Sequence, residues 1–352
     1  MQIGIYLKRI NKYSRILQIE FCKILFLKGV IKLIKERKFI LLTVISTVLI
    51  SSKVLIVKQT LNQGLPAEQI LYLRMLMATP MFLIIYLFYR KKHSSTHIVY
   101  KDYWLIGLIG VFGFFLSPLF DFKGTYYIPA TIERVLIFSY PLFIFIYSLF
   151  SERKQIKITY LYILIGVLLG LLLSINGFNF RSFGNANIKG VILVLIASML
   201  YSISLILSQQ VVRRVGSMNL TSLSELISFL VLVIYFVFTG NSHFMDITKV
   251  NLTSYSLILI MVIFSTVIPF FLLNECIKYI GATKVSLISI IGPIFTSFID
   301  VLLLKESISY SQLLGGGLII LSIYFLDFYE KKISVSKHLK IKEEKEGVDN
   351  YM

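Results

Sequence analysis

Five ionisable residues interrupt otherwise apolar stretches and are the first candidates for chemistry: Lys53, Arg74, Glu133, Arg134 and Asp300. A charge within a membrane span is costly and usually faces a cavity or an opposite charge. Three of the five are cations and two are carboxylates, so one positive charge is left that could bind a carboxylate or phosphate of a solute. Alternatively, the five pair with each other or extend to the membrane surface and leave nothing for a ligand.

A second group of candidates surrounds two prolines inside apolar runs. Proline frees a backbone carbonyl and bends a helix, so Pro141 and Pro293 are predicted hinges, and Gly292 makes the second bend easier. A static kink required by packing is the alternative. Tyr140, next to the first proline, could offer a substrate an aromatic wall and a hydroxyl group.

Glu275, next to Asn274, could carry a proton for coupling if it is buried, or it could simply contact headgroups or a loop amine. His93 and His97 have a spacing that could bind a metal on a helix, but they lie in a short loop without a carboxylate cluster. We therefore predict no metal site and no cofactor. No nucleophile elbow, phosphate-binding glycine loop or paired-carboxylate motif is evident, and an enzyme is not expected.

Ten apolar stretches must position these residues, each of about 20 residues, the length that crosses a hydrocarbon core of about 30 Å. The chain is 57% hydrophobic with a mean hydropathy of +0.80. The alternating polarity of barrel strands is absent, so helices must satisfy the backbone in lipid. We predict an all-α, polytopic membrane protein with ten transmembrane helices. The spans are 39-58, 67-89, 103-122, 126-150, 158-177, 188-210, 219-239, 254-275, 282-304 and 309-328.

The chain has 36 lysines and arginines against 18 acidic residues. Most of the basic residues fall in the N-terminal segment, the C-terminal tail and alternate loops, as the positive-inside rule requires when both termini are cytoplasmic. This topology in the inner membrane accounts for the charge, and no nucleic-acid partner is expected. Residues 1-38 are predicted as a basic cytoplasmic leader that either lies as an interfacial helix on anionic lipid or is solvated, and residues 329-352 as a disordered cytoplasmic tail. The five charges listed first all fall in the outer half of the bilayer.

The second half of the chain repeats the first at an offset of 152 residues. Gly64 corresponds to Gly216, Pro141 to Pro293, and the stretch 127–131 to 279–283. Because five helices per unit is an odd number, the second unit must enter the membrane from the opposite side. Inverted repeats of this kind place a substrate between the halves and allow alternating access, although duplication also yields membrane proteins that transport nothing.

The sequence resembles the EamA-type members of the drug/metabolite transporter superfamily. The resemblance covers about residues 39-328 and rests on Lys53, the stretch from Pro66 to Arg74, and two copies of a Tyr-x-x-Ala-Thr, Pro, Glu pattern at 127-152 and 279-306. It implies two EamA-type repeats, 39-178 and 188-328, in an inner-membrane permease for amino acids, related metabolites or other small organic solutes. The chain departs from the commoner pattern in its long basic leader and at Pro141 to Glu152, two residues shorter than its counterpart.

A second class of function stays open on the sequence alone. A non-transporting membrane scaffold or sensor could use the basic leader to recruit a partner. Removal of residues 1-35 discriminates the two, because a permease should keep its flux whereas a scaffold should lose its phenotype. For the permease, the expected partners are a small-molecule substrate and the lipid bilayer, and a homodimer is possible.

Overall fold

The computed structural model describes residues 36–92, 98–151, 187–248, 250–290 and 292, and single positions within 162–173 and 314–325. All regular structure in these parts of the chain is helical, without a strand. The predicted leader up to residue 35, the tail 329–352, Pro293 and Asp300 lie outside the described residues.

Six helices in the described part of the chain are long and apolar enough to cross a bilayer, which supports the predicted polytopic, all-helical fold. They are Glu36–Asn62, Ala67–Lys91, Tyr100–Tyr127, Ile188–Val215, Ser217–Phe238 and Leu252–Ile280. The predicted fourth span is described as two shorter helices. Most of the predicted fifth, ninth and tenth spans falls outside the described residues, so the number ten stays a prediction.

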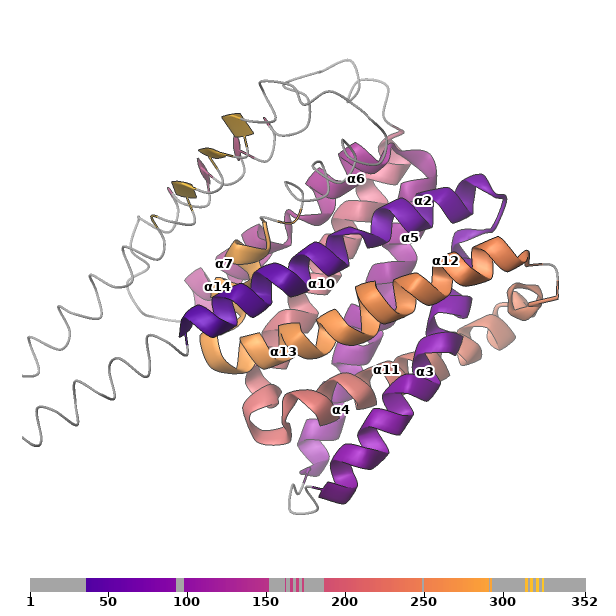
Figure 1. Ribbon diagram of the computed structural model, residues 1–352, viewed down its shortest axis with the longest axis horizontal. Helices are drawn as coiled ribbons and strands as arrows, with labels where there is room; N and C mark the ends of the chain where they lie inside the picture. Colours follow the sequence, from indigo (N-terminus) through magenta and orange to yellow (C-terminus); the bar gives the residue numbers. More distant parts are fainter. Residues whose placement is uncertain are drawn as a thin grey trace, which may run out of the picture.

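The first half of the chain contains the helices labelled α2 to α7 in Figure 1 and a π-helical segment, η1, between α4 and α5. After a turn at Ser52, α2 completes the first span, and η1 interrupts the third. The bounds are α2 (Lys53–Asn62), α3 (Ala67–Lys92), α4 (Tyr100–Ile109), η1 (Gly110–Leu116), α5 (Ser117–Tyr127), α6 (Ala130–Ile137) and α7 (Tyr140–Ser151).

The second half follows the same order. Here too a π-helical segment, η3, interrupts the long helix that corresponds to the third span. The bounds are α10 (Ile188–Val215), α11 (Ser217–Phe238), the short 3-10 helix η2 (Ser242–Met245), α12 (Leu252–Val262), η3 (Ile263–Val267), α13 (Ile268–Ile280) and α14 (Ala282–Ser289).

Helix boundaries recur at the offset of 152 residues found in the sequence. The spans that begin at residues 36 and 100 correspond to those that begin at 188 and 252, and α6 corresponds to α14 over its whole length. The turn between the first two spans of each half contains a glycine with positive φ, +89° at Gly64 and +84° at Gly216. A side chain would be strained in that left-handed conformation, so glycine is required at both turns.

Corresponding helices of the two halves run in opposite directions. At one end of the α3–α11 pair, Gln69 near the start of α3 donates a hydrogen bond to the carbonyl of Asp246, which follows α11 in the chain. At the other end, Gly216 at the start of α11 lies next to Tyr89 near the end of α3. This is the relation expected of inverted repeats.

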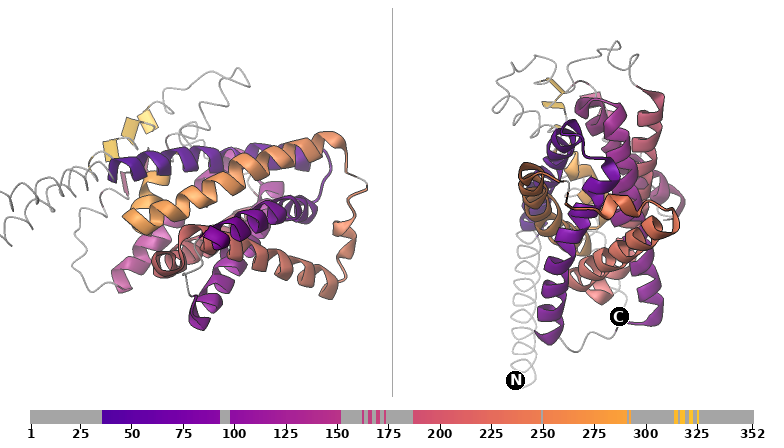
Figure 2. Two further views of the ribbon diagram at one scale, coloured as in Figure 1. Left: turned by 60° about the horizontal axis from the view of Figure 1, so that its bottom comes forward. Right: turned by 90° about the vertical axis from the view of Figure 1, so that its right-hand side faces the viewer.

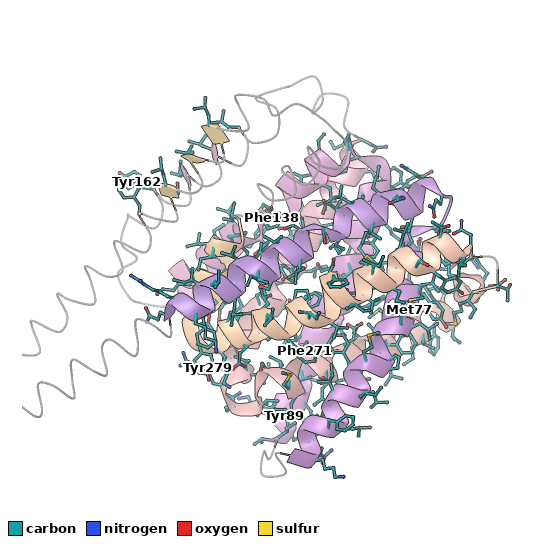
Figure 3. All side chains as sticks on the ribbon, in the orientation of Figure 1. Met77, Tyr89, Phe138, Tyr162, Phe271 and Tyr279 are labelled. Atoms are coloured by element: carbon teal, nitrogen blue, oxygen red, sulfur yellow. The ribbon has the colours of Figure 1, made fainter. Side chains whose placement is uncertain are left out.

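The first span of one half packs along the α12–α13 helix of the other (Figures 1 and 2). The rings of Phe39 and Tyr279 stack at one end with centroids 4.1 Å apart, and Figure 3 places Tyr279 beside the start of the first span. At the opposite end Ser254 donates a hydrogen bond to Gln63. The two halves are therefore interleaved and share their apolar cores.

Large apolar side chains also cover the outside of the helices. Among them are Leu87, Phe88, Trp104, Leu230 and Val237, all more than half exposed. Soluble proteins rarely expose apolar surface on this scale, and a bilayer would cover it. Inside the bundle, serines such as Ser198, Ser202, Ser204 and Ser208 line the buried face of α10, where small hydroxyl residues let helices approach closely.

Candidate functional site

A cavity of about 70 Å³ lies between the two halves of the chain, and both contribute to its wall. Four predicted site residues, Lys53, Arg74, Glu133 and Tyr140, lie on that wall. Much of the remaining wall carries hydroxyl groups, from Thr47, Ser51, Ser117, Tyr201, Ser265, Thr266 and Ser289. Because ligand pockets usually measure about 300–1,000 Å³, the wall must move before a whole solute can enter.

Lys53 lines the cavity as the first residue of α2, directly after the turn at Ser52 in the first span. Its ammonium group lies 2.6 Å from Oδ2 of Asp121 on α5 and 5.4 Å from the centre of the Phe122 ring. The Lys53 side chain is 21% exposed and that of Asp121 only 2%, so the cation lies between the cavity and its buried counterion.

Arg74 is 2% exposed, and its position depends on a proline in another helix. Its Nη2 donates a hydrogen bond of 2.9 Å to the carbonyl of Phe114 in η1. In a regular helix that carbonyl would accept from residue 118, but Pro118 has no N–H to give. The π-helical segment and the proline together leave an acceptor for the guanidinium group.

Two carboxylates that the sequence analysis did not single out lie close to these cations. Asp121 pairs with Lys53, and Glu225, in the interior of α11, is 0% exposed. Arg74 interacts electrostatically with both. Among the described residues at the site, the cations Lys53 and Arg74 therefore face three carboxylates, with Glu133 as the third. The prediction of one excess positive charge omitted Asp121 and Glu225, and the described residues do not reproduce it.

The structure describes the side chains of only some of the predicted site residues of the fourth span. Glu133 lies on α6, is 2% exposed and faces the cavity. The backbone of Arg134 belongs to α6 as well, whereas its side chain lies outside the described residues. Tyr140 is buried, and its ring meets that of Tyr201 edge-on with centroids 5.0 Å apart. Whether these groups bind a solute stays a prediction.

The predicted hinge at Pro141 coincides with a break in the fourth span. The break lies at Phe138 and Ser139, between α6 and α7, and Pro141 lies in the first turn of α7, where its missing N–H costs no hydrogen bond. In the second half α14 ends at Ser289, the position that corresponds to the end of α6. Both halves therefore interrupt this helix at the same place, beside the cavity, and motion there stays a prediction.

Glu275 has different surroundings from those its predicted coupling role needs. It accepts a hydrogen bond from Ser217, and its Oε1 lies 3.7 Å from Nζ of Lys278 one turn further along α13. Its side chain is 32% exposed and does not line the cavity. These are local contacts of a partly exposed carboxylate near the end of α13.

No group of three or more potential metal ligands occurs among the residues that the structure places. His93 and His97 lie outside them. The chemistry available at the cavity is therefore that of ammonium, guanidinium, carboxylate and hydroxyl groups, which bind and orient a polar solute by charge and hydrogen bonds.

A polytopic helical bundle with interleaved halves and a charged cavity between them defines a multi-pass membrane protein of the transporter class. The chain belongs to the EamA-like transporter family, whose model matches it twice, at residues 37–176 and 188–327. This confirms the resemblance found in the sequence, and it identifies a membrane transporter rather than an enzyme.

Individual relatives agree with this assignment. The chain is 33% identical over 289 residues to "Uncharacterized transporter YcbK" of Bacillus subtilis, a match that covers 82% of this chain and 92% of the relative. It is 23% identical over 239 residues to an "Uncharacterized transporter" of Methanothermobacter thermautotrophicus. A crystal structure of a protein only 14% identical superimposes with a TM-score of 0.64 over 84% of this chain and 99% of that chain, which shows a shared fold.

Proposed function

We propose that this protein is an inner-membrane secondary transporter that moves small organic metabolites, such as amino acids or related compounds, by alternating access. The observation that carries the proposal is the cavity between the interleaved halves, with Lys53 and Arg74 on its wall. In transporters built from inverted repeats, the substrate lies at the interface of the repeats near the middle of the membrane.

The antiparallel pairing of α3 with α11 and the common helix boundaries support a full architecture of ten helices in two inverted repeats. In this architecture both termini lie in the cytoplasm, because the basic residues gather on that side. The halves then exchange an inward-open and an outward-open arrangement around a fixed site. The small cavity of about 70 Å³ belongs to a closed state between these two arrangements.

Two cations on the wall, Lys53 and Arg74, offer a place for an anionic group of a solute. A carboxylate or phosphate of the solute would bind between the ammonium group of Lys53 and the guanidinium group of Arg74, because charge-assisted hydrogen bonds are about twice as strong as neutral ones. Glu133, on the same wall, would attract an amino group. A small solute with both charges therefore fits the site best.

Flux into proteoliposomes tests the proposal. A panel of radiolabelled amino acids, organic acids and nucleotides should include at least one solute with saturable uptake that protein-free liposomes lack. Lys189→Met serves as a control in which a lysine outside the site is replaced. It should transport like the parent, because Lys189 is exposed, contacts Tyr127 and does not line the cavity. Absence of saturable flux for every solute on the panel would contradict the proposal.

A further inference from the structure

Glu225 is a fully buried carboxylate that lacks a hydrogen-bond donor. It lies in the interior of α11, is 0% exposed, and neither carboxylate oxygen has a hydrogen-bond partner. Its neighbours on the helix, Ser222 and Ser228, are fully buried too and their hydroxyl groups likewise lack partners. A buried carboxylate without a donor is stable only next to a cation or in its protonated form.

The cation next to Glu225 is Arg74, and it connects this buried group to the cavity. The guanidinium group lines the cavity on one side and interacts electrostatically with Glu225 and Asp121 on the other. One of its nitrogens, Nε, has no hydrogen-bond partner. A change of charge at Glu225 or in the cavity therefore changes the electrostatic interactions of the same group, the guanidinium of Arg74.

The other described helices that pack against α11 bring no further charge to this position. From α3, Tyr72 faces α11 at Phe229 and Phe236, beyond Arg74. The segment η1 has no ionisable side chain. Where α4 joins η1, Ser224 donates a hydrogen bond to the carbonyl of Ile106. Its backbone packs so closely on Gly110 that no charged side chain fits between the two helices there.

The remaining charges near α11 lie at its ends. Glu275 of α13 contacts Ser217, eight residues from Glu225, which is about 12 Å along a helix. The ion pair of Asp102 with Arg214 brings α4 and α10 together at that same end. From η2, His243 lies beyond the opposite end of the helix. Among the residues that the structure describes, Arg74 is therefore the charged group that acts on Glu225.

We propose that Glu225 is the proton-binding site of the transport cycle. With Glu225 ionised, Lys53 is balanced by Asp121 and Arg74 by Glu225, while Glu133 on the same wall is a third carboxylate, so an anionic group that enters beside the two cations adds one more negative charge. Transfer of one proton from hydronium to a carboxylate oxygen of Glu225 neutralises Glu225 and so compensates the charge that the solute adds. Arg74 then pairs with the solute instead of with Glu225. When the solute leaves, the carboxylic acid returns its proton to water. The solute in this cycle rests on the proposed function.

Infrared difference spectra test the proton site without any solute. Purified full-length protein is compared at acidic and alkaline pH, and the carbonyl stretch of a protonated carboxylic acid without hydrogen bonds is followed, which lies at a higher frequency than that of the hydrated carboxyl groups of the chain. We expect this band in the parent and in Glu275→Gln, and its loss in Glu225→Gln. Glu225→Asp should keep an acid band at a shifted frequency, which shows that the loss reports the carboxyl group and not a misfolded helix. An unchanged band in a folded Glu225→Gln protein would overturn the proposal.

Transport gives a second readout with a solute identified by the flux panel. We expect an inward proton gradient to raise parental uptake at least tenfold, and the ratio of uptake with the gradient to uptake without it to fall to about one in Glu225→Gln. Glu275→Gln should keep the parental ratio. A parental ratio in Glu225→Gln would overturn this inference alone, whereas absence of any parental flux would contradict the proposed function and leave the infrared result to decide on Glu225.

Discussion

Replacement of Lys53 by methionine is expected to lower the free energy of unfolding by about 3 kcal/mol, because it leaves the buried carboxylate of Asp121 without its direct partner. Breaking a buried ion pair by removal of one partner costs more than the pair itself contributes. The measurement is a denaturant titration of the purified protein in mixed micelles, with parental protein and Lys189→Met alongside. A Lys53→Met protein as stable as the parent would contradict the assigned ion pair.

The double variant Lys53→Met/Asp121→Asn separates the structural role of this pair from its role at the cavity. Replacement of both charges should restore most of the lost stability, since no unpaired charge is then left in the bundle. Uptake should stay at least tenfold below that of the parent, because the ammonium group on the cavity wall is still missing. Recovery of uptake together with stability would show that Lys53 only holds the fold.

Gly292→Ala is expected to destabilise the protein by about 1–3 kcal/mol, the usual range for overpacking a tight contact. A methyl group at this position would collide with Ser51 and Thr47 of the first span and with the ring of Phe138, at the break between α6 and α7. Three elements from both halves meet here, beside the cavity. The change should also reduce uptake, since it separates helices that must fit together when the cavity closes.

Gly107→Ala is the matched control for Gly292→Ala. A methyl group on Gly107, in α4, would meet no atom within 4 Å. Since alanine favours a helix over glycine, this variant should be as stable as the parent or more stable by up to about 1 kcal/mol. If both glycine variants unfold at the same denaturant concentration, the close contact at Gly292 does not contribute to the free energy of unfolding, which would contradict the prediction.

The sequence predicted much of this fold because its signals are strong and local. Long apolar runs follow from the length that a segment needs to cross a bilayer, and the 152-residue offset is visible in the recurrence of single residues such as Gly64 and Gly216. The same applies to Lys53, Arg74 and Glu133, since a charge within a span must face a cavity or a partner. The structure indeed brings these three to one cavity, together with Tyr140.

The partners of these charges could not be predicted in the same way. A span that is apolar on all sides gives no amphipathic pattern, so its rotation about its axis, and hence the pairing of Lys53 with Asp121, 68 residues away, is not readable. Glu225 follows Thr221, Ser222 and Ser224, and these polar neighbours give no sign in the sequence that it is buried. The π-helical segments change the register without a periodic signal, although a proline follows each of them by two residues, Pro118 after η1 and Pro269 after η3.

The central claim is that the cavity between the two halves opens to each side of the membrane in turn, and the accessibility of one engineered cysteine tests it most directly. The sequence has only two cysteines, so Cys22→Ser/Cys276→Ser gives a clean background for Ser265→Cys on the cavity wall. Membrane-impermeant maleimide should label this cysteine from either side, whereas Ser222→Cys, fully buried away from the cavity, should react from neither. Labelling of Ser265→Cys from one side only, or from neither, would contradict alternating access.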